Sequence, residues 1–307
     1  MLTARLFFVL AFLGSTLLAS TLSFAREQKQ QLRRGVEYIY DERHDPAQRV
    51  FVVIIDLMKS GAEIDVAGGG ADPDGEGEWE TILKPVPAIA RNERFDIAIN
   101  GDFFSHLGGK DAEGAAALKE FKGDTPASVT GAAISDGRVW SKSDEARPAF
   151  VVTKSRKLLI VPSNKVPEDA EEAIAGSDVL VKDGKDVATR EGGLSKTRHP
   201  RTVIGFGDKG KTLVLLVVDG RKKGVAEGMT FAELAAEMLR LGCDEAINLD
   251  GGGSSTLVFR DGRKNDVQVM NAPSDGRPRA VANALGITFK SDRGIRVEKA
   301  DDAPIKP

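Results

Sequence analysis

Short runs of apolar and β-branched residues, separated by turns rich in Gly and Asp, recur along most of this 307-residue chain. Residues 202–206 and 212–218 are two such runs, and the Gly-Asp-Lys-Gly segment between them predicts a β-hairpin. Residues 50–57 are almost all apolar, which is typical of a strand that is buried on both faces. This pattern predicts a domain built mainly from strands.

One segment has the spacing of a helix instead. Between residues 231 and 241, apolar side chains recur every three or four positions. Thr230 and Glu233 can form a capping box at its start, and Gly242 follows its last turn. The chain shows no internal repeat and no low-complexity linker. We therefore expect the α+β fold class, as a single strand-rich mixed α/β domain with few helices over residues 26–292, with residues 26–34 as a polar, frayed lead-in.

The first 25 residues have the composition of a signal peptide. Arg5 supplies a positive start, residues 6–18 are mostly apolar, and Ser23 and Ala25 are small residues before a cleavage point near Ala25. The apolar run is shorter than the roughly 20 residues that span a bilayer, and an uncleaved anchor is the alternative. The pattern predicts a Sec-exported, periplasmic or secreted protein with no stable membrane insertion after cleavage. Residues 293–307 are charged and are expected to be disordered.

Charge and cysteine content exclude several kinds of partner and site. The chain has 43 Lys and Arg against 46 Asp and Glu, a net charge of −3, so it lacks the basic excess of a nucleic-acid-binding protein. Removal of residues 1–25 takes away one positive charge, Arg5, and leaves −4. Cys243 is the only cysteine, which rules out an internal disulfide framework and a CxxC zinc site.

Residues 205–212 match the phosphate-binding P-loop pattern Gly-x-x-x-x-Gly-Lys-Ser/Thr. A P-loop needs a helix directly after it, because the N-terminus of that helix holds the phosphates. Here the next residues, 213–218, are Leu-Val-Leu-Leu-Val-Val and predict a strand. We therefore interpret the segment as a glycine-rich β-turn and not as a nucleotide site.

Residues 248–255, Asn-Leu-Asp-Gly-Gly-Gly-Ser-Ser, form the most distinctive polar segment. Its carboxylate follows a predicted strand, in a position that often carries function. Three consecutive glycines leave backbone N–H groups able to approach an anion. The alternative is a tight turn stabilised by local hydrogen bonds, but such a turn rarely needs three glycines and two hydroxyls. The candidates here are Asn248, Asp250, Gly251, Gly252, Gly253, Ser254 and Ser255.

Two other regions place polar residues next to predicted strands. The strand predicted over residues 95–100 ends in Asn100, and Gly101 and Asp102 follow it and precede two phenylalanines, so the alternative is a turn followed by core residues. His199 and Arg201 precede the first strand of the hairpin. Histidine can exchange a proton near neutral pH, and arginine recognises phosphate or carboxylate through two points.

Asp219 and Arg221 follow the second strand of the hairpin, where a turn with a surface ion pair is the alternative. Together, the carboxylates, the two arginines, the histidine and the glycine-rich turn suit an anionic, hydroxyl-rich ligand such as a sugar phosphate. Two carboxylates are what glycoside cleavage usually needs. Divalent-metal binding is a competing use, because hard cations take Asp and Asn oxygens.

In order and approximate spacing, these segments resemble the phosphodiester glycosidase family. The resemblance covers about residues 90–290 and rests on residues 99–104, 199–202, 218–221, 228–234 and 248–255. It implies a strand-rich mixed α/β fold. It also implies hydrolysis of a sugar-1-phosphodiester at the anomeric carbon, with a glycan or sugar phosphate as substrate, in envelope glycan or exopolysaccharide processing.

Under this hypothesis, Arg201, His199 and the glycine amides stabilise the departing phosphate, while Asp250 stabilises an oxocarbenium-like centre or activates water. Two alternatives stay open: a periplasmic protein that binds glycan without cleaving it, and a metal-dependent phosphodiesterase. No cofactor is certain, and a divalent cation stays open. The candidate catalytic residues are Asp250, His199, Arg201, Asp219 and Asp102, and the candidate substrate-binding residues are Asn100, Gly101, Arg221, Asn248, Gly251, Gly252, Gly253, Ser254 and Ser255.

Overall fold

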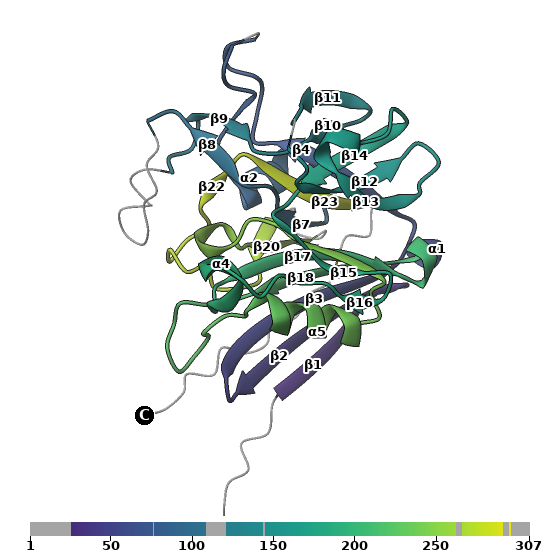
Figure 1. The fold of residues 1–307 in the computed structure, drawn as a ribbon, viewed down its shortest axis with the longest axis vertical. Coiled ribbons are helices and arrows are strands. Elements are labelled where there is room, and N and C mark those ends of the chain that lie inside the picture. Colours follow the sequence, from purple (N-terminus) through teal and green to yellow (C-terminus); the bar gives the residue numbers. More distant parts are fainter. Residues whose placement is uncertain are drawn as a thin grey trace, which may run out of the picture.

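The computed structural model describes residues 26–75, 77–108, 121–143, 145–261, 266–290 and Ile295. The predicted signal peptide and, apart from Ile295, the predicted disordered tail lie outside these residues. An eight-stranded antiparallel sheet forms one side of the fold (Figure 1). In spatial order its strands are β1 (Arg26–Arg33), β2 (Val36–His44), β3 (Ala47–Asp56), β18 (Thr212–Val218), β17 (Arg201–Gly207), β19 (Glu245–Asn248), β15 (Asp178–Lys182) and β16 (Lys185–Asp186).

Smaller sheets complete the strand-rich part of the described chain. A second sheet has the order β21 (Asp266–Val269), β20 (Leu257–Asp261), β7 (Ile97–Asn100), β23 (Asn283–Phe289) and β4 (Ala62–Gly68). A third has the order β11 (Arg138–Ser141), β10 (Ala133–Ser135), β14 (Ala170–Ala175), β12 (Pro148–Thr153) and β13 (Leu158–Pro162). Short pairings join β5 (Thr81–Ile82), β9 (Pro126–Val129) and β8 (Phe104–His106), and join β22 (Ala280–Val281) to β6 (Lys84–Pro85).

The α-helices in the described residues are α1 (Leu57–Ser60), α2 (Val86–Asn92), α4 (Gly193–Lys196) and α5 (Phe231–Arg240), and short 3₁₀ turns cover Ser163–Lys165, Asp208–Gly210 and Gly252–Ser254. The longest, α5, is the helix expected from the sequence. The Glu233 backbone N–H donates to the Thr230 hydroxyl at 3.2 Å, and the Thr230 N–H donates to the Glu233 carboxylate at 2.9 Å. The predicted capping box is therefore confirmed. None of the helices described here is both long and apolar enough to cross a membrane.

The buried core explains why the central strands are apolar on both faces. Alternate residues of β18 point in opposite directions. Positions 213, 215 and 217 pack with second-sheet residues such as Ile99, and positions 214, 216 and 218 pack with α5 residues such as Leu234. On the far side of the second sheet, α2 packs through Val86 and Ile89. The layers are therefore α5, the large sheet, the second sheet and α2, and Figure 1 shows α5 on the outer face of the large sheet.

The predicted α+β, strand-rich fold class is confirmed. The hairpin over residues 201–218 is also confirmed, and with it the rejection of the P-loop, because a strand follows residues 205–212. The expected frayed lead-in at residues 26–34 is wrong. Residues 26–33 form β1, whose side chains are mostly solvent-accessible but whose backbone pairs along β2. Its polar composition reflects a position at the sheet edge.

Strand pairing brings the predicted polar segments to one end of the fold. Because β17 is antiparallel to both of its neighbours, its first residue, Arg201, pairs with the last residue of β18, Val218. The end of β19 pairs with the same part of β17, through Asn248 and Val203. In the second sheet, β7 ends at Asn100, whose backbone N–H bonds to the carbonyl of Thr256 just after the glycine-rich turn. The turns after these strands therefore meet.

Candidate active site

A cleft of about 400 Å³ opens where these turns meet. It combines residues from the start of β17, the turn after β18, the glycine-rich turn after β19 and the segment before β22. Seven of the fourteen predicted site residues line it, so the predicted association of the His-Pro-Arg, Asp-Gly-Arg and glycine-rich segments is correct. The lining residues are Phe103, Phe121, Leu194, His199, Arg201, Arg221, Asp250, Gly251, Gly252, Gly253 and Arg279.

Asp250 is the carboxylate that lines this cleft in the described part of the chain. Its Oδ1 accepts a 2.8 Å hydrogen bond from the Gly251 N–H. Burial raises the pKa of this carboxyl to about 6, while the Ser254 hydroxyl, the guanidinium groups of Arg279 and Arg221, and the Gly251 N–H act to lower it. Asp250 can therefore change its protonation state within reach of neutral pH.

The three glycines allow close approach more than they supply free amides. The Gly251 N–H is used by Asp250, and the Gly252 N–H donates to the Pro200 carbonyl at 3.0 Å. Among the described residues, the Gly253 N–H has no hydrogen-bond partner. A Cβ on Gly251 would lie 2.7 Å from the Pro200 oxygen. Only one of the three expected donors is therefore left to face an anion.

The glycines also admit two arginines to the cleft. A Cβ on Gly252, which has a left-handed φ of 61°, would lie 3.1 Å from Nη2 of Arg221. A Cβ on Gly253 would lie 2.1 Å from the Asp275 carboxylate and 2.3 Å from Nη2 of Arg279. Arg221 and Arg279 can therefore pack directly against the backbone of this turn only because its glycines carry no Cβ.

Arg279 is a site residue that the sequence interpretation missed. Its Nε donates to Asp275 at 2.8 Å, and its guanidinium lies 4.2 Å from the ring centre of Phe121. The Asp275 side chain is 1% exposed, so the pair is held in a fixed position. A signal existed, because Arg-Pro-Arg at residues 277–279 precedes β22 just as His-Pro-Arg precedes the body of β17.

Arg201 lines the cleft but is almost fully buried, with 1% exposure. Its Nε donates to the Met229 carbonyl, and its Nη2 donates to the carbonyls of Leu194 and Thr197. The guanidinium also lies 4.7 Å from the ring centre of Phe231. Burial lowers the pKa of Arg201 to about 10. Arg201 thus fixes the walls of the cleft as well as contributing charge to it. His199, beside it, is half-buried and pairs with Met229 through the backbone.

Asn100 and Gly101 lie behind the cleft and do not line it. The Asn100 amide donates to the backbone carbonyl of Asp250 at 2.7 Å, and its Oδ1 accepts from the Thr202 hydroxyl and the Thr256 N–H. A Cβ on Gly101 would lie 2.2 Å from Oδ1 of Asn283. These two predicted substrate-binding residues are therefore placed to support the turn at Asp250.

Asp102 is also behind the cleft, with 1% exposure. Its two carboxylate oxygens accept backbone N–H groups of Phe103 and Gly131, each at 2.7 Å. Burial raises the pKa of Asp102 to about 7, against the effect of these hydrogen bonds and of Arg147. A group enclosed in this way does not contact a ligand in the cleft, so Asp102 is placed to fasten the turn after β7 to the turn after β9.

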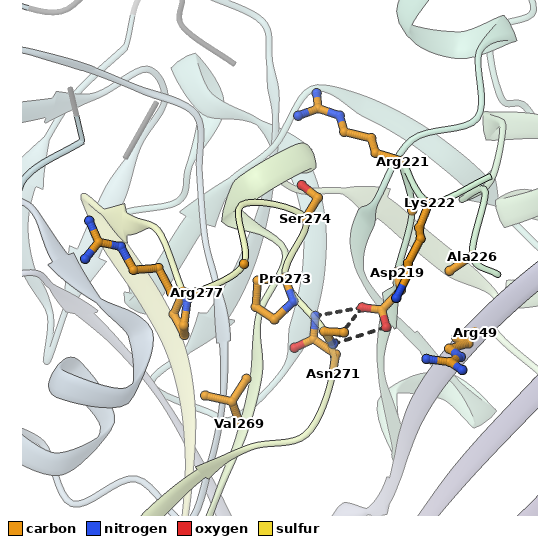
Figure 2. Close-up of a pocket in the computed structure, with 14 residues that line it drawn as sticks. Arg49, Asp219, Arg221, Lys222, Ala226, Val269, Asn271, Pro273, Ser274 and Arg277 are labelled. Atoms are coloured by element: carbon orange, nitrogen blue, oxygen red, sulfur yellow. Dashed lines mark hydrogen bonds between the residues drawn. The ribbon is translucent and has the colours of Figure 1, made fainter. Parts of the chain in front are cut away.

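Asp219 faces a different, adjoining cleft of about 530 Å³, shown in Figure 2. Its Oδ1 accepts 3.0 Å hydrogen bonds from the Asn271 side-chain amide and from the Ala272 N–H. Burial raises the pKa of this carboxyl to about 6, while those two groups and Arg49 act to lower it. Arg221 lines both clefts. Asp219 is thus separated from the Asp250 cleft, and it anchors the loop that leads to Arg279.

The remaining predicted residues are buried. Asn248 is 0% exposed, and its amide donates to the Ser177 hydroxyl at 3.0 Å and to the Leu249 carbonyl. Ser254 and Ser255 are 0% and 1% exposed. Within the described residues, the Ser255 hydroxyl has no hydrogen-bond partner, whereas the Ser254 hydroxyl is close enough to Asp250 to lower the pKa of that carboxyl. None of these three residues lines the cleft. Asn248 precedes the lining residues 250–253 in the chain, and Ser254 and Ser255 come directly after them. In the same part of the chain, no group of three or more His, Cys, Asp and Glu side chains is arranged to hold a metal ion.

The fold has counterparts among solved structures. The catalytic domain of zebrafish N-acetylglucosamine-1-phosphodiester alpha-N-acetylglucosaminidase, auto-inhibited by its pro-peptide, aligns with a TM-score of 0.59 and 20% identity, over 86% of this chain and 87% of that chain. A hypothetical protein from Synechocystis aligns with a TM-score of 0.59 and 14% identity, over 86% and 64%. A putative exported protein from Burkholderia pseudomallei K96243 gives 0.52 and 16%, over 82% and 74%. The chain therefore shares the fold of the zebrafish catalytic domain.

Sequence comparison gives the family. Residues 93–288, more than half of the chain, match the family model for phosphodiester glycosidases. The chain therefore belongs to the phosphodiester glycosidase family, a family of hydrolases. The SPbeta prophage-derived uncharacterized protein YomE of Bacillus subtilis (strain 168) is 31% identical over an alignment of 233 residues that covers 72% of this chain. The chain spans only 32% of the length of that relative.

Proposed function

We propose that this protein hydrolyses sugar-1-phosphodiesters at the anomeric carbon of the sugar. The observation that carries the proposal is the composition of the cleft. It is lined by one carboxyl residue, Asp250, and by the three arginines Arg201, Arg221 and Arg279, of which Arg201 is almost fully buried. Membership of the phosphodiester glycosidase family supports the same chemistry.

The charge of the cleft fits a phosphate leaving group. An ordinary glycosidase uses two carboxyl groups, one of which protonates a poor alkoxide leaving group. A phosphomonoester leaves far more readily and needs stabilisation of negative charge instead of a proton. Arginines held in a partly buried cleft provide that stabilisation without reorganising during the reaction. A site with one carboxyl and three arginines is therefore better suited to a glycosyl phosphate than to a simple glycoside.

The residues then take distinct roles. The Asp250 carboxylate stabilises the oxocarbenium-like sugar or activates the attacking water. Arg279, Arg221 and the Gly253 N–H bind the departing phosphate, with His199 and Arg201 beside them. Water adds its oxygen to the anomeric carbon, the bond from that carbon to the phosphate oxygen breaks, and the phosphomonoester keeps that oxygen. One proton of the water stays on the new anomeric hydroxyl of the sugar, and the other passes to the phosphomonoester or to solvent.

We place this activity outside the cytoplasm, in processing of envelope glycan or exopolysaccharide. The support is the sequence of residues 1–25, with its positive start, apolar run and small residues before position 26. Expression of the full-length chain with an epitope tag, followed by cell fractionation and N-terminal sequencing, tests this part. Mature protein that begins at Arg26 in the periplasm or medium would support it, and uncleaved cytoplasmic protein would contradict it.

The activity is tested with a panel of sugar-1-phosphodiesters that differ in sugar and in anomeric configuration. We expect release of free sugar by the wild-type protein and a loss of about 10²–10⁴-fold in kcat/KM for Asp250→Asn. Each assay is run with and without a chelator, because a fully chelator-sensitive release of a sugar phosphate would indicate a metal-dependent phosphodiesterase. Saturable glycan binding with no turnover of any member would indicate a binding protein. Asp169→Asn, an exposed site, serves as the control variant.

A further inference from the structure

The cleft at Asp219 adjoins the candidate active site and has no part in the reaction just described. Figure 2 shows Asn271 on one side of the Asp219 carboxylate and Lys222 and Arg49 on the other. The turn that carries Lys222 is closed by two backbone hydrogen bonds between Lys222 and Ala226, at 2.9 and 2.8 Å. The Lys222 side chain itself is exposed. This cleft therefore has a fixed floor and a cationic rim.

The two clefts are joined through Arg221. Its guanidinium lies against Gly252 in the Asp250 cleft, and its backbone follows Asp219 and Gly220 in the neighbouring cleft. In Figure 2 the Arg221 side chain points away from the Asp219 carboxylate. A ligand that extends from one cleft to the other would therefore pass beside one residue, Arg221.

The charge around the two clefts is opposite to that of the whole chain. Together they are lined by six Arg and Lys residues and by two Asp residues, whereas the whole chain has a net charge of −3. Asp219 itself reduces the charge in the second cleft, and so does Glu42, which pairs with Arg49 at 3.1 Å. Asp219 is turned to the loop, where its Oδ1 accepts two hydrogen bonds. Lys222 and Arg277 supply the charge at the rim.

We propose that the cleft lined by Asp219, Lys222 and Arg277 is a second anion subsite, which binds the next phosphate along a substrate that contains several glycosyl phosphate units. The inference rests on the proposed function for its assignment of the first phosphate to the Asp250 cleft. It makes the substrate class an oligomer or polymer of phosphate-linked sugars or polyols. Two phosphates bound at adjoining sites raise affinity together, because the second binds intramolecularly.

The test uses ligands that the proposed reaction cannot cleave. Glycerol phosphate oligomers contain phosphodiesters but no anomeric carbon. Binding to the purified wild-type protein is measured by calorimetry with the oligomer of one phosphodiester and with that of three, at fixed ionic strength because salt screens exposed charges. Three identical groups alone give about a threefold statistical gain, and we expect the longer oligomer to bind at least about 10-fold more tightly.

Two neighbouring lysines separate a built subsite from general attraction. Lys222→Gln is expected to reduce the preference for the longer oligomer to about the threefold statistical value. Lys223→Gln is the matched control, since Lys223 is equally exposed and lies outside both clefts, and it should keep the wild-type preference. Equal losses in the two variants, or no length preference in the wild-type protein, including no binding at all, would overturn the proposal.

The outcome for the subsite is independent of the outcome for catalysis. A length preference that depends on Lys222, found in a protein that releases no sugar from sugar-1-phosphodiesters, would support the second subsite and contradict the proposed activity. Sugar release without a length preference would support the activity and contradict the subsite.

Discussion

Asn100 donates a 2.7 Å hydrogen bond from its side-chain amide to the backbone carbonyl of Asp250, a residue 150 positions away in the chain. The return connection is a 2.9 Å bond from the Asp250 N–H to the Gly101 carbonyl. The end of β7 in the second sheet is thereby fastened to the end of β19 in the large sheet. The Asn100-Gly101 segment and the glycine-rich turn at Asp250 are thus bonded directly to each other, and the first helps to hold the second in place.

Replacement of Asn100 by Asp is expected to destabilise the protein. The new carboxylate would place an acceptor oxygen against the Asp250 carbonyl in a position with 0% exposure. A buried polar group left without its partner costs about 1–3 kcal/mol, and a charge costs more. Urea unfolding should show a lower midpoint with an unchanged slope. The exposed Asn92→Asp, at the end of α2, should cost no more than about 1 kcal/mol. Equal effects at the two sites would contradict this account.

Gly253→Ala tests whether the glycine-rich turn exists to admit Arg279 and Asp275. The added Cβ would lie within 2.3 Å of both side chains, so the pair must move. A displacement of about 1 Å in a positioning group can reduce the rate about 100-fold, and we expect a loss of that order in kcat/KM. Gly193→Ala is the control, because its Cβ would meet no atom within 4 Å. Full activity in Gly253→Ala would show that Arg279 has no role.

Asp219 is expected to act as a positioning residue through the loop from Asn271 to Arg279. Its Oδ1 accepts hydrogen bonds from the Asn271 amide and the Ala272 N–H, and the Ala272 N–H is shared with Oδ2 at 3.1 Å. Asp219→Asn can keep both bonds through the same oxygen, whereas Asp219→Ala loses them. We therefore expect kcat to fall by about 10-fold or more in the Ala variant. The Asn variant should recover most of it. If Asp219 took part directly as a charged group, the Asn variant would be as inactive as the Ala variant.

The stability of the protein should depend on pH through Asp102. Burial raises the pKa of this carboxyl from 3.8 to about 7, so the folded state binds its proton more tightly than the unfolded state does. Its contribution to stability is therefore complete below about pH 4 and is lost as the pH rises to about 7. Three pKa units correspond to up to about 4 kcal/mol.

Unfolding free energies measured from pH 4 to 7 test this assignment. Asp102→Asn should remove most of that loss, so its free energy should vary less with pH than that of the wild-type protein. Asp169→Asn, at an exposed position, should keep the wild-type dependence. The same pH dependence in Asp102→Asn and the wild type would show that Asp102 is not the group that titrates.

The features that the sequence predicts well are those set by residues that lie close together along the chain. The hairpin of β17 and β18 follows from two apolar runs around a glycine-rich turn, and α5 follows from Thr230, Glu233 and Gly242. In β1, the residues are polar because the strand lies at a sheet edge. Its pairing with β2 is not visible in its own composition. Polar edge strands and frayed termini look alike in sequence.

In the candidate site, too, some features follow from local sequence and others depend on contacts between segments that are distant in the chain. Strand ends placed Asp250, His199, Arg201 and Arg221 in one cleft, as their positions in the sequence indicated. The close approach of Arg279 to Gly253 depends on how the loop after Asn271 folds back, which no local pattern specifies. The same holds for the burial of Asp102, which is enclosed by strands that are distant in the sequence. Side-chain roles therefore required the three-dimensional structure, although the location of the cleft did not.

The position of an isotope label after hydrolysis tests the central claim most directly. A sugar-1-phosphodiester is hydrolysed by the wild-type protein in ¹⁸O-labelled water, and the sugar and phosphate products are examined separately by mass spectrometry, under conditions in which the free sugar does not exchange its anomeric oxygen. Attack at the anomeric carbon puts the label in the sugar and leaves the phosphomonoester unlabelled, which is the result that we predict. Label in the phosphate product would mean cleavage of the P–O bond and would contradict the assignment of Asp250 and the arginines.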